Sequence, residues 1–249
     1  MVLVALVVWL VLQSSGWPAV QEQFFNWDIF TQSFPEVLRA FPVNIEIFLI
    51  AEAIVLVVGL LLALMRSLRA PIFFPLRAFA VVYCDFFRGI PTILLVYLLG
   101  FGAPALQLQG VPQSPLLWGI IALSLVYSAY VAEVYRAGIE SVHPSQDQAA
   151  RSLGLSHTQA LRYVVLPQAV RRVIPPLLND FIGLQKDSAL IAVLGVVEAL
   201  RQAQIDSSAT FNYTPYIATA ILFLAMTIPL TRFVDWLVAR QRKRQSGLV

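Results

Sequence analysis

The stretch that decides the fold class runs from Gly89 to Ala132 and reads GIPTILLVYLLGFGAPALQLQGVPQSPLLWGIIALSLVYSAYVA. It contains no Asp, Glu, Lys or Arg. A membrane-spanning helix needs ~20 apolar residues, so this stretch is too long for one span and fits two. Glycine and proline mark the reversal between the two spans, at Gly102, Pro104, Gly110, Pro112 and Pro115.

The composition of the whole chain also indicates a membrane protein. Of its 249 residues, 59% are hydrophobic and 12% are charged, and the mean hydropathy is +0.76. A soluble domain has about 45–50% apolar residues and about 25% charged residues. This chain therefore needs lipid as part of its solvent. This excludes an ordinary soluble enzyme, a coiled coil and a disordered protein. One cysteine, Cys84, excludes an intrachain disulfide, and two histidines, His143 and His157, offer little for a metal site.

Three further stretches predict helices in the membrane. They are Val43–Met65, which carries Glu46 and Glu52, Val173–Val197, which carries Asp180, Lys186 and Asp187, and Ser207–Thr231, which carries no charge. With the two spans above, five transmembrane helices are expected from Val43 onward.

The N-terminal run, Met1–Leu12, is apolar but short. As a helix it would reach ~18 Å, less than the ~30 Å hydrocarbon core. A signal peptide would have a basic region and a small-residue cleavage site, and neither precedes Gln13. A short or truncated transmembrane helix is therefore favoured, with an interfacial segment as the alternative.

The arginines orient the spans, because positive residues concentrate on the cytoplasmic side of a membrane. They gather between the Val43 helix and the next, in the polar stretch after Ala132, and at the C-terminus: Arg66, Arg69 and Arg77, then Arg136, Arg151, Arg162, Arg171 and Arg172, then Arg240, Arg242 and Arg244 with Lys243. The opposite loops hold only Arg39 and Arg201. We therefore expect Ser141–Leu166 and Gln241–Val249 inside, and Gln13–Pro42 and Gly102–Ser114 outside.

These boundaries divide the chain into three parts. An N-terminal apolar helix and extracytoplasmic segment occupies 1–42, a transmembrane domain occupies 43–240, and a basic cytoplasmic tail occupies 241–249. The transmembrane domain includes a cytoplasmic loop at 138–167, which is too long for a bare connector.

Two capping boxes predict two short helices in this loop. The first begins at Ser145, with Gln148 at its third position, and runs through Leu153 to a glycine of positive φ, Gly154. The second begins at Ser156 and stops at Pro167. The alternative is a loop that lies on the bilayer.

Several ordered motifs resemble a known family. The run QAARSLG at 148–154, followed by VVLP at 164–167, resembles the EAA loop of ATP-binding-cassette (ABC) importer permeases. Segments similar to those of the polar amino acid permeases are FRGIP at 87–91, AYVAE at 129–133, NDF at 179–181 and KDS at 186–188. The resemblance covers Val43 to about Arg242. It implies an all-α, polytopic type I importer permease with a five-helix core at about 43–240. The family motif usually opens with Glu, and Gln148 stands there without the charge.

The resemblance implies that this chain is one subunit of a larger transporter. Two permease subunits would form the pathway across a bacterial inner membrane, an ATPase dimer would power it, and an extracytoplasmic binding protein would deliver the amino acid to it. The chain lacks the phosphate-binding motif G-x-x-x-x-G-K-[ST], so it is expected to hold no cofactor, and Mg-ATP would bind the ATPase. The coupling residues would be Ser145, Gln146, Asp147, Gln148, Ala149, Ala150, Arg151, Ser152, Leu153, Gly154 and Leu155. Ala149, Ala150 and Gly154 would allow close approach of the ATPase.

Charges at membrane depth are functional hypotheses by default. By resemblance, the segment around Asp187 and the Tyr127–Ser128 region line the substrate cavity, and the Asp187 carboxylate would receive the α-ammonium of the cargo. The expected pathway residues are Glu52, Tyr127, Ser128, Asp187 and Ser188. We interpret Asp85 with Arg88, and Glu133 with Arg136, as structural pairs three residues apart on one helix.

A stand-alone secondary transporter or channel for small polar solutes is the alternative function, and its cytoplasmic loop would be incidental. An intramembrane enzyme has little support, because the chain holds no H-E-x-x-H or G-x-S-x-G motif. The sequence leaves open which amino acid is carried and whether the second permease is a copy of this chain.

Overall fold

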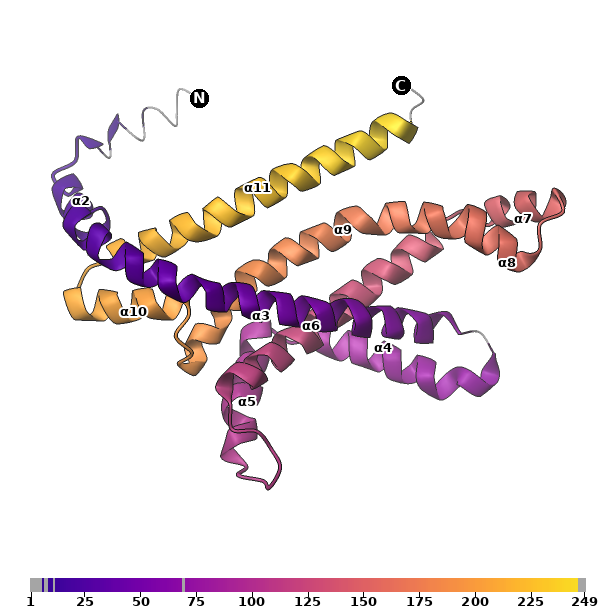
Figure 1. Cartoon of the computed structure of the whole chain (residues 1–249), viewed down its shortest axis with the longest axis horizontal. Coiled ribbons are helices and arrows are strands. Elements are labelled where there is room, and N and C mark those ends of the chain that lie inside the picture. The colour runs from indigo at the N-terminus through magenta and orange to yellow at the C-terminus, as the bar shows by residue number, and fades with distance from the viewer. Residues whose placement is uncertain (1–5, 7–8, 11, 69, 246–249) are drawn as a thin grey trace.

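A computed structural model of the chain describes residues 6, 9–10, 12–68 and 70–245, with side chains through residue 240. These residues form helices and connecting turns, without a β-strand among them (Figure 1). The helices are α2 (Trp17–Phe24), α3 (Trp27–Ser67), α4 (Phe74–Gly89), α5 (Thr92–Ala105), α6 (Pro115–Glu140), α7 (Pro144–Ser152), α8 (His157–Ala160), α9 (Leu166–Asp187), α10 (Ala199–Thr210) and α11 (Thr214–Gln245), with the short 3-10 or π segments η1 (Pro71–Phe73), η2 (Leu161–Val165) and η3 (Ser188–Leu194) between them. The predicted N-terminal helix, Met1–Leu12, lies largely outside the described residues.

Helix α3 is much longer than the sequence predicts. It begins at Trp27 rather than Val43, and the side chain of Asn26 caps it by accepting from the backbone N–H of Asp28, at 3.1 Å. Pro35 and Pro42 lie inside the helix without ending it. The early residues of α3 pack against α10 and α11, and this tertiary burial outweighs the hydrogen bonds that the two prolines remove.

The first span predicted in the Gly89–Ala132 stretch is one arm of a bent helix pair rather than a straight helix of its own. Helix α4 ends at Gly89 and α5 begins at Thr92, with a bend of 100° between them. Pro91 explains the break, because a proline pushes the residue before it out of the helical region. Ile90 has an extended backbone, with φ −97° and ψ 133°.

The last two predicted spans also have different bounds. Helix α9 covers Leu166–Asp187, continues as η3, and bends by 49° into α10. The uncharged run Ser207–Thr231 is split at Phe211, which has φ 52°, so the last span begins at Thr214. Three helices of the described residues are long and apolar enough to cross a membrane, and the count rises to five if each bent pair is one span. The expected number of five corresponds to this upper count.

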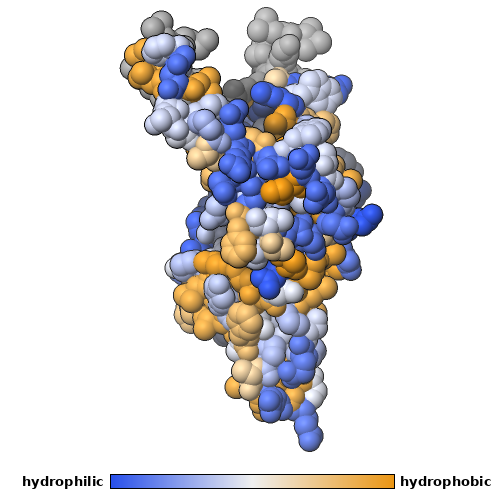
Figure 2. All heavy atoms as spheres, turned by 90° about the vertical axis from the view of Figure 1, so that its left-hand side faces the viewer, coloured by the Kyte–Doolittle hydropathy of each residue, from blue (hydrophilic) through white to orange (hydrophobic). Residues whose placement is uncertain are grey.

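The three basic segments share one end of the molecule. In Figure 1 the end of α3, the start of α4, the α7–α8 hairpin and the end of α11 lie toward the right, whereas α2 and α10 lie at the left. Figure 2 looks onto the left-hand end and shows hydrophilic residues gathered over it, bordered by hydrophobic ones. The long axis therefore separates a basic end from an opposite end formed by α2, α10 and the start of α3.

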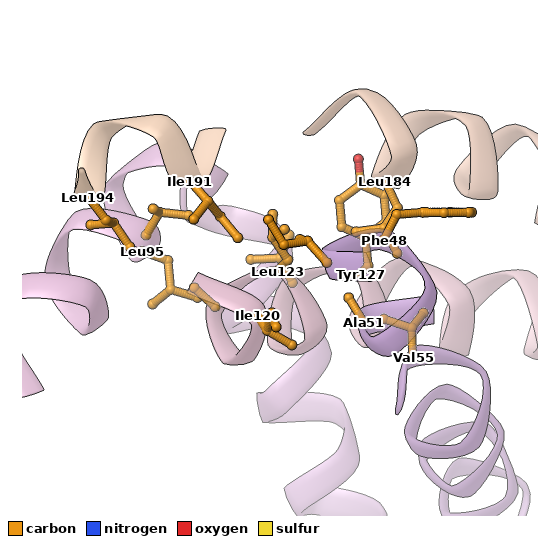
Figure 3. Packing of buried hydrophobic residues seen from close by; sticks show 14 of the residues in the cluster. Phe48, Ala51, Val55, Leu95, Ile120, Leu123, Tyr127, Leu184, Ile191 and Leu194 are labelled. Atoms are coloured by element: carbon orange, nitrogen blue, oxygen red, sulfur yellow. The ribbon is translucent and has the colours of Figure 1, made fainter. Parts of the chain in front are cut away.

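Helix α6 forms the centre of the bundle and contacts α3, α4, α5 and α9. In Figure 3, Leu123 and Tyr127 of α6 lie close to Phe48 of α3 and Leu184 of α9. All four side chains are buried. This packing fixes α3, α6 and α9 relative to one another at the level of the predicted pathway residues.

Candidate functional site

Tyr127 and Asp187 meet between α6 and α9. The Tyr127 hydroxyl donates a hydrogen bond to Oδ2 of Asp187, at 2.9 Å. Asp187 is the last residue of α9 and is half-buried, and its neighbour Lys186 is exposed. The structure thus brings together two of the five predicted pathway residues, which lie 60 positions apart in the chain.

A second acidic pair lies beside them. Glu52 of α3 is buried, and its carboxyl group interacts electrostatically with Asp180 of α9. Oδ2 of Asp180 is buried and has no hydrogen-bond partner within the described part of the chain. Asp180 was absent from the predicted pathway residues. A usable signal existed, because Asp180 precedes Asp187 by two helical turns and therefore shares its face.

The two predicted serines are committed to internal hydrogen bonds. Ser128 donates to the carbonyl of Ser124, at 2.5 Å. Ser188 is fully buried, accepts from the Asn44 amide at 3.2 Å and donates to the carbonyl of Gln185 at 2.7 Å. Both hydroxyls therefore stabilise the helices that carry Tyr127 and Asp187.

Ser188 belongs to a buried polar network that the sequence did not reveal. The Asn44 amide also donates to Oε2 of Glu198, at 2.6 Å, and Glu198 caps α10 by accepting from the backbone N–H of Leu200 and Arg201. Glu198 is fully buried. The network fixes the start of α10 against α3, next to the end of η3.

Ion pairs at the basic end differ from the sequence prediction in one respect. Glu133 pairs with Arg136, as expected, and also with Arg66 of α3 at 2.7 Å. Arg88 lies 3.7 Å from Glu133, and no ion pair joins it to Asp85 among the residues described. The expected Asp85–Arg88 pair is therefore wrong, because the carboxylate on α6 lies nearer to Arg88. Glu133 thus connects α3, α4 and α6.

The α7–α8 hairpin forms the tip of the basic end, but its first helix starts earlier than predicted. Helix α7 begins at Pro144, and His143 caps it by accepting from the backbone N–H of Ser145, at 3.2 Å. The predicted capping box with Ser145 as the cap is therefore wrong. Proline is favoured at the first helical position, which moves the start of the helix ahead of Ser145.

Two other predicted features of the hairpin are confirmed, the positive φ of Gly154 and the second capping box. Gly154 has φ +88°, and the N–H of Leu155 donates to the carbonyl of Ala150 at 3.3 Å, as in a Schellman motif. Ser156 and Gln159 form the second capping box. The second helix does not stop at Pro167, however.

The hairpin continues directly into α9. The π segment η2 follows α8, and the N–H of Leu166 donates to the carbonyl of Leu161, five residues back. Pro167 lies in the first turn of α9, where its missing N–H costs little. Gln168 ties α9 back to α7 by donating to Gln146, at 3.2 Å. The hairpin and α9 therefore form one connected unit.

The outward face of the hairpin differs from the face predicted from its small residues. Ala150 is only 5% exposed and packs within its own chain, so it cannot be the surface that a partner approaches. Ala149, Gln148 and Gly154 are exposed. Leu153 is 83% exposed at the end of α7, although its side chain is large and apolar. Ala150 was thus assigned to the wrong side of the helix, and Leu153 is the more prominent outward residue.

The described residues hold no group of three His, Cys, Asp or Glu side chains placed to bind a metal ion. Cys84 is buried.

Comparison with known proteins gives consistent matches over most of the chain. The family model of binding-protein-dependent transport system inner membrane components matches residues 55–243. The protein named "Probable amino-acid permease protein YxeN" of Bacillus subtilis is 35% identical over 204 residues, which cover 82% of this chain and 90% of that protein. The arginine transport system permease protein ArtQ of Bacillus subtilis is 32% identical over 210 residues, which cover 84% of this chain and 93% of that protein. A crystal structure of an amino acid ABC transporter with histidines superposes with a TM-score of 0.77 at 33% identity, covering 86% of this chain and 98% of that one.

Proposed function

The chain belongs to the family of binding-protein-dependent transport system inner membrane components, the permease subunits of ABC importers, and from this premise we propose that its cargo is a polar amino acid. The names of its relatives, which include an arginine permease, support this cargo. In our proposal the chain pairs with a second permease subunit, either a copy of itself or a different chain. An extracytoplasmic binding protein supplies the cargo.

ATP hydrolysis would be carried out by a partner ATPase dimer. The permease chain has no phosphate-binding loop motif, so Mg-ATP would bind the ATPase and this chain would carry no cofactor of its own. The contact would be made by the hairpin residues 145–155, with Leu153 and Ala149 outward. Gln148 is exposed there and would take the place of the usual glutamate without its charge.

One observation supports this coupling most strongly, namely the unbroken path from the hairpin to the pathway residues. Helix α9 continues from η2 and ends at Asp187. Its 22 residues span ~33 Å at 1.5 Å per residue. A rigid shift of the hairpin would therefore move Asp187 relative to Tyr127 on α6 and alter the hydrogen bond between them.

The orientation of the chain follows from its arginines. The basic end would face the cytoplasm, with the hairpin and the C-terminus, and the α2–α10 end would face outward in a bacterial inner membrane. Shared placement of the three basic segments at one end supports this orientation.

The cargo would pass along Tyr127, Asp187, Glu52 and Asp180. Three carboxyl groups at membrane depth with Lys186 as the nearby cation favour a group that carries positive charge, such as an α-ammonium. The Asp187 carboxylate would receive that group, while Ser128 and Ser188 would stabilise the helices that carry Tyr127 and Asp187.

The coupling proposal can be tested in proteoliposomes that contain the permease, the ATPase and the binding protein. Leu153→Ala should remove the apolar contact and abolish the stimulation of ATP hydrolysis by the loaded binding protein, while insertion in the membrane is retained. Ile72→Ala is the matched control, because Ile72 is 80% exposed at the same end but lies outside the hairpin. Gln148→Glu should be tolerated. If the loaded binding protein stimulates ATP hydrolysis equally in the Leu153→Ala and Ile72→Ala complexes, the hairpin does not couple the permease to the ATPase.

A further inference from the structure

A small pocket with several polar residues in its lining lies between α3 and α10, at the end opposite the basic segments. Its volume is about 140 Å³, several times the ~30 Å³ that one water molecule occupies in the liquid. Ser33 and Glu36 of α3 line it on one side, and Asp206 and Thr210 of α10 line it on the other. The pocket is separate from the Tyr127–Asp187 site.

Two buried oxygen atoms of this pocket lack a hydrogen-bond partner. Ser33 is only 5% exposed, and its Oγ makes no hydrogen bond to any described residue. Oδ2 of Asp206 is also buried and unpaired, although Oδ1 accepts from the Gln202 amide at 2.8 Å. Buried polar atoms in folded proteins are normally paired, so two unpaired oxygen atoms on residues that line one pocket indicate a missing hydrogen-bond donor.

The charge of the pocket selects the kind of donor. The carboxylates of Glu36 and Asp206 interact electrostatically across it. Arg39 binds one oxygen of Glu36 at 2.7 Å, but its own side chain is 73% exposed and it does not line the pocket. A cation with several N–H groups would offset the repulsion between the carboxylates and supply donors to both orphan oxygens. Guanidinium and ammonium groups have this chemistry.

We propose that this pocket receives the guanidinium or ammonium group of a basic side chain on the extracytoplasmic binding protein. The proposal rests on the function proposed above, which places this end of the molecule outside. The family is defined by dependence on a binding protein, so such a partner must approach the outer end. A single basic side chain inserted between α3 and α10 would also contact the two helices that the Asn44–Glu198 network joins.

The direct test measures the affinity of the binding protein for the complete transporter in lipid nanodiscs. Asp206→Asn and Ser33→Ala should each weaken this association, by roughly tenfold for the charge change. Asp28→Asn is the matched charge control, because Asp28 is exposed near the same end but does not line the pocket. Ser208→Ala is the matched hydroxyl control, because Ser208 bonds the carbonyl of Gln204 on the same helix.

A competition measurement identifies the chemistry of the occupant. Propylguanidinium should weaken the association of the binding protein with the wild-type transporter. It should have little effect on the association with the Asp206→Asn transporter. Neutral propylurea, which has the same shape, should have no effect on either. In addition, Ser33→Ala should not lower the unfolding temperature of the transporter, because the hydroxyl that it removes has no partner.

The possible results separate this inference from the proposed function. If the wild-type transporter responds to its binding protein and both pocket variants bind it as tightly as the two controls do, the pocket inference is wrong and the function stands. If propylguanidinium occupies the pocket without competing with the binding protein, the site serves a free solute and the docking role is refuted. If the wild-type transporter does not bind a binding protein at all, the proposed function itself fails.

Discussion

Gly138 is the position where a single methyl group should disturb the contact between α6 and α9. It lies near the end of α6, and a Cβ added there would overlap Cγ2 of Val173 on α9 and lie 3.5 Å from the carbonyl oxygen of Ala169. Val173 and Ala169 are both buried, so α9 has little room to yield. Gly138→Ala should therefore push α6 and α9 apart just above the hairpin.

The magnitude follows from two opposing terms. Overpacking a close contact costs ~1–3 kcal/mol, while alanine gains ~1 kcal/mol over glycine in a helix. Because the overlap with Val173 is severe, we expect a net loss of ~1–2 kcal/mol. At ~2–4 °C per kcal/mol for a chain of this size, the unfolding temperature should fall by ~2–8 °C.

The assay combines thermal unfolding of the purified transporter with ATP hydrolysis stimulated by the binding protein. Gly138→Ala should lower both the unfolding temperature and the stimulation. The double variant Gly138→Ala/Val173→Ala should recover stimulation, because the smaller side chain makes room for the new methyl group. Gly102→Ala is the control, since a Cβ at that position meets no atom within 4 Å.

Two results would refute this reasoning. If Gly138→Ala unfolds at the wild-type temperature and is stimulated normally, the α6–α9 contact does not limit the position of α9. If Val173→Ala fails to restore stimulation to Gly138→Ala, the loss has another cause than the overlap at this contact.

Three other predictions concern the cargo, the buried network and the orientation. Asp187→Asn should leave assembly intact but reduce amino acid uptake. A charge-assisted hydrogen bond is worth ~1.5–3 kcal/mol, which is roughly a tenfold to hundredfold change in binding. Unchanged uptake kinetics would remove Asp187 from the pathway. Glu198→Ala should lower the unfolding temperature of the transporter, because the Asn44 amide and two backbone N–H groups lose their acceptor. Each unsatisfied buried group costs ~1–3 kcal/mol. An unaltered unfolding temperature would show that water replaces the carboxylate. In a Cys84→Ala background, a cysteine at Gln109 should react with an impermeant maleimide from outside, and labelling only from the cytoplasmic side would reverse the proposed orientation.

The sequence by itself determined the class of structure and much of the hairpin. Uncharged runs of the right length predict spans because lipid cannot solvate charged groups, and this signal is local. The Ser156–Gln159 capping box and the positive φ of Gly154 were also predictable, because helix ends obey short-range rules. The first box failed for a local reason too, since Pro144 competes with Ser145 for the start of α7.

Only the tertiary structure decided which residues meet and which faces turn outward. Arg88 pairs with Glu133 on another helix rather than with Asp85 on its own, and Ala150 turns inward where the sequence predicted a partner surface. Helix α3 extends through two prolines because its early residues are buried against α10 and α11. In each case the deciding interaction joins positions far apart in the chain. Spacing along one helix fixes a side chain's direction on that helix, whereas burial and ion pairing depend on the neighbouring helices, whose positions only the folded chain defines.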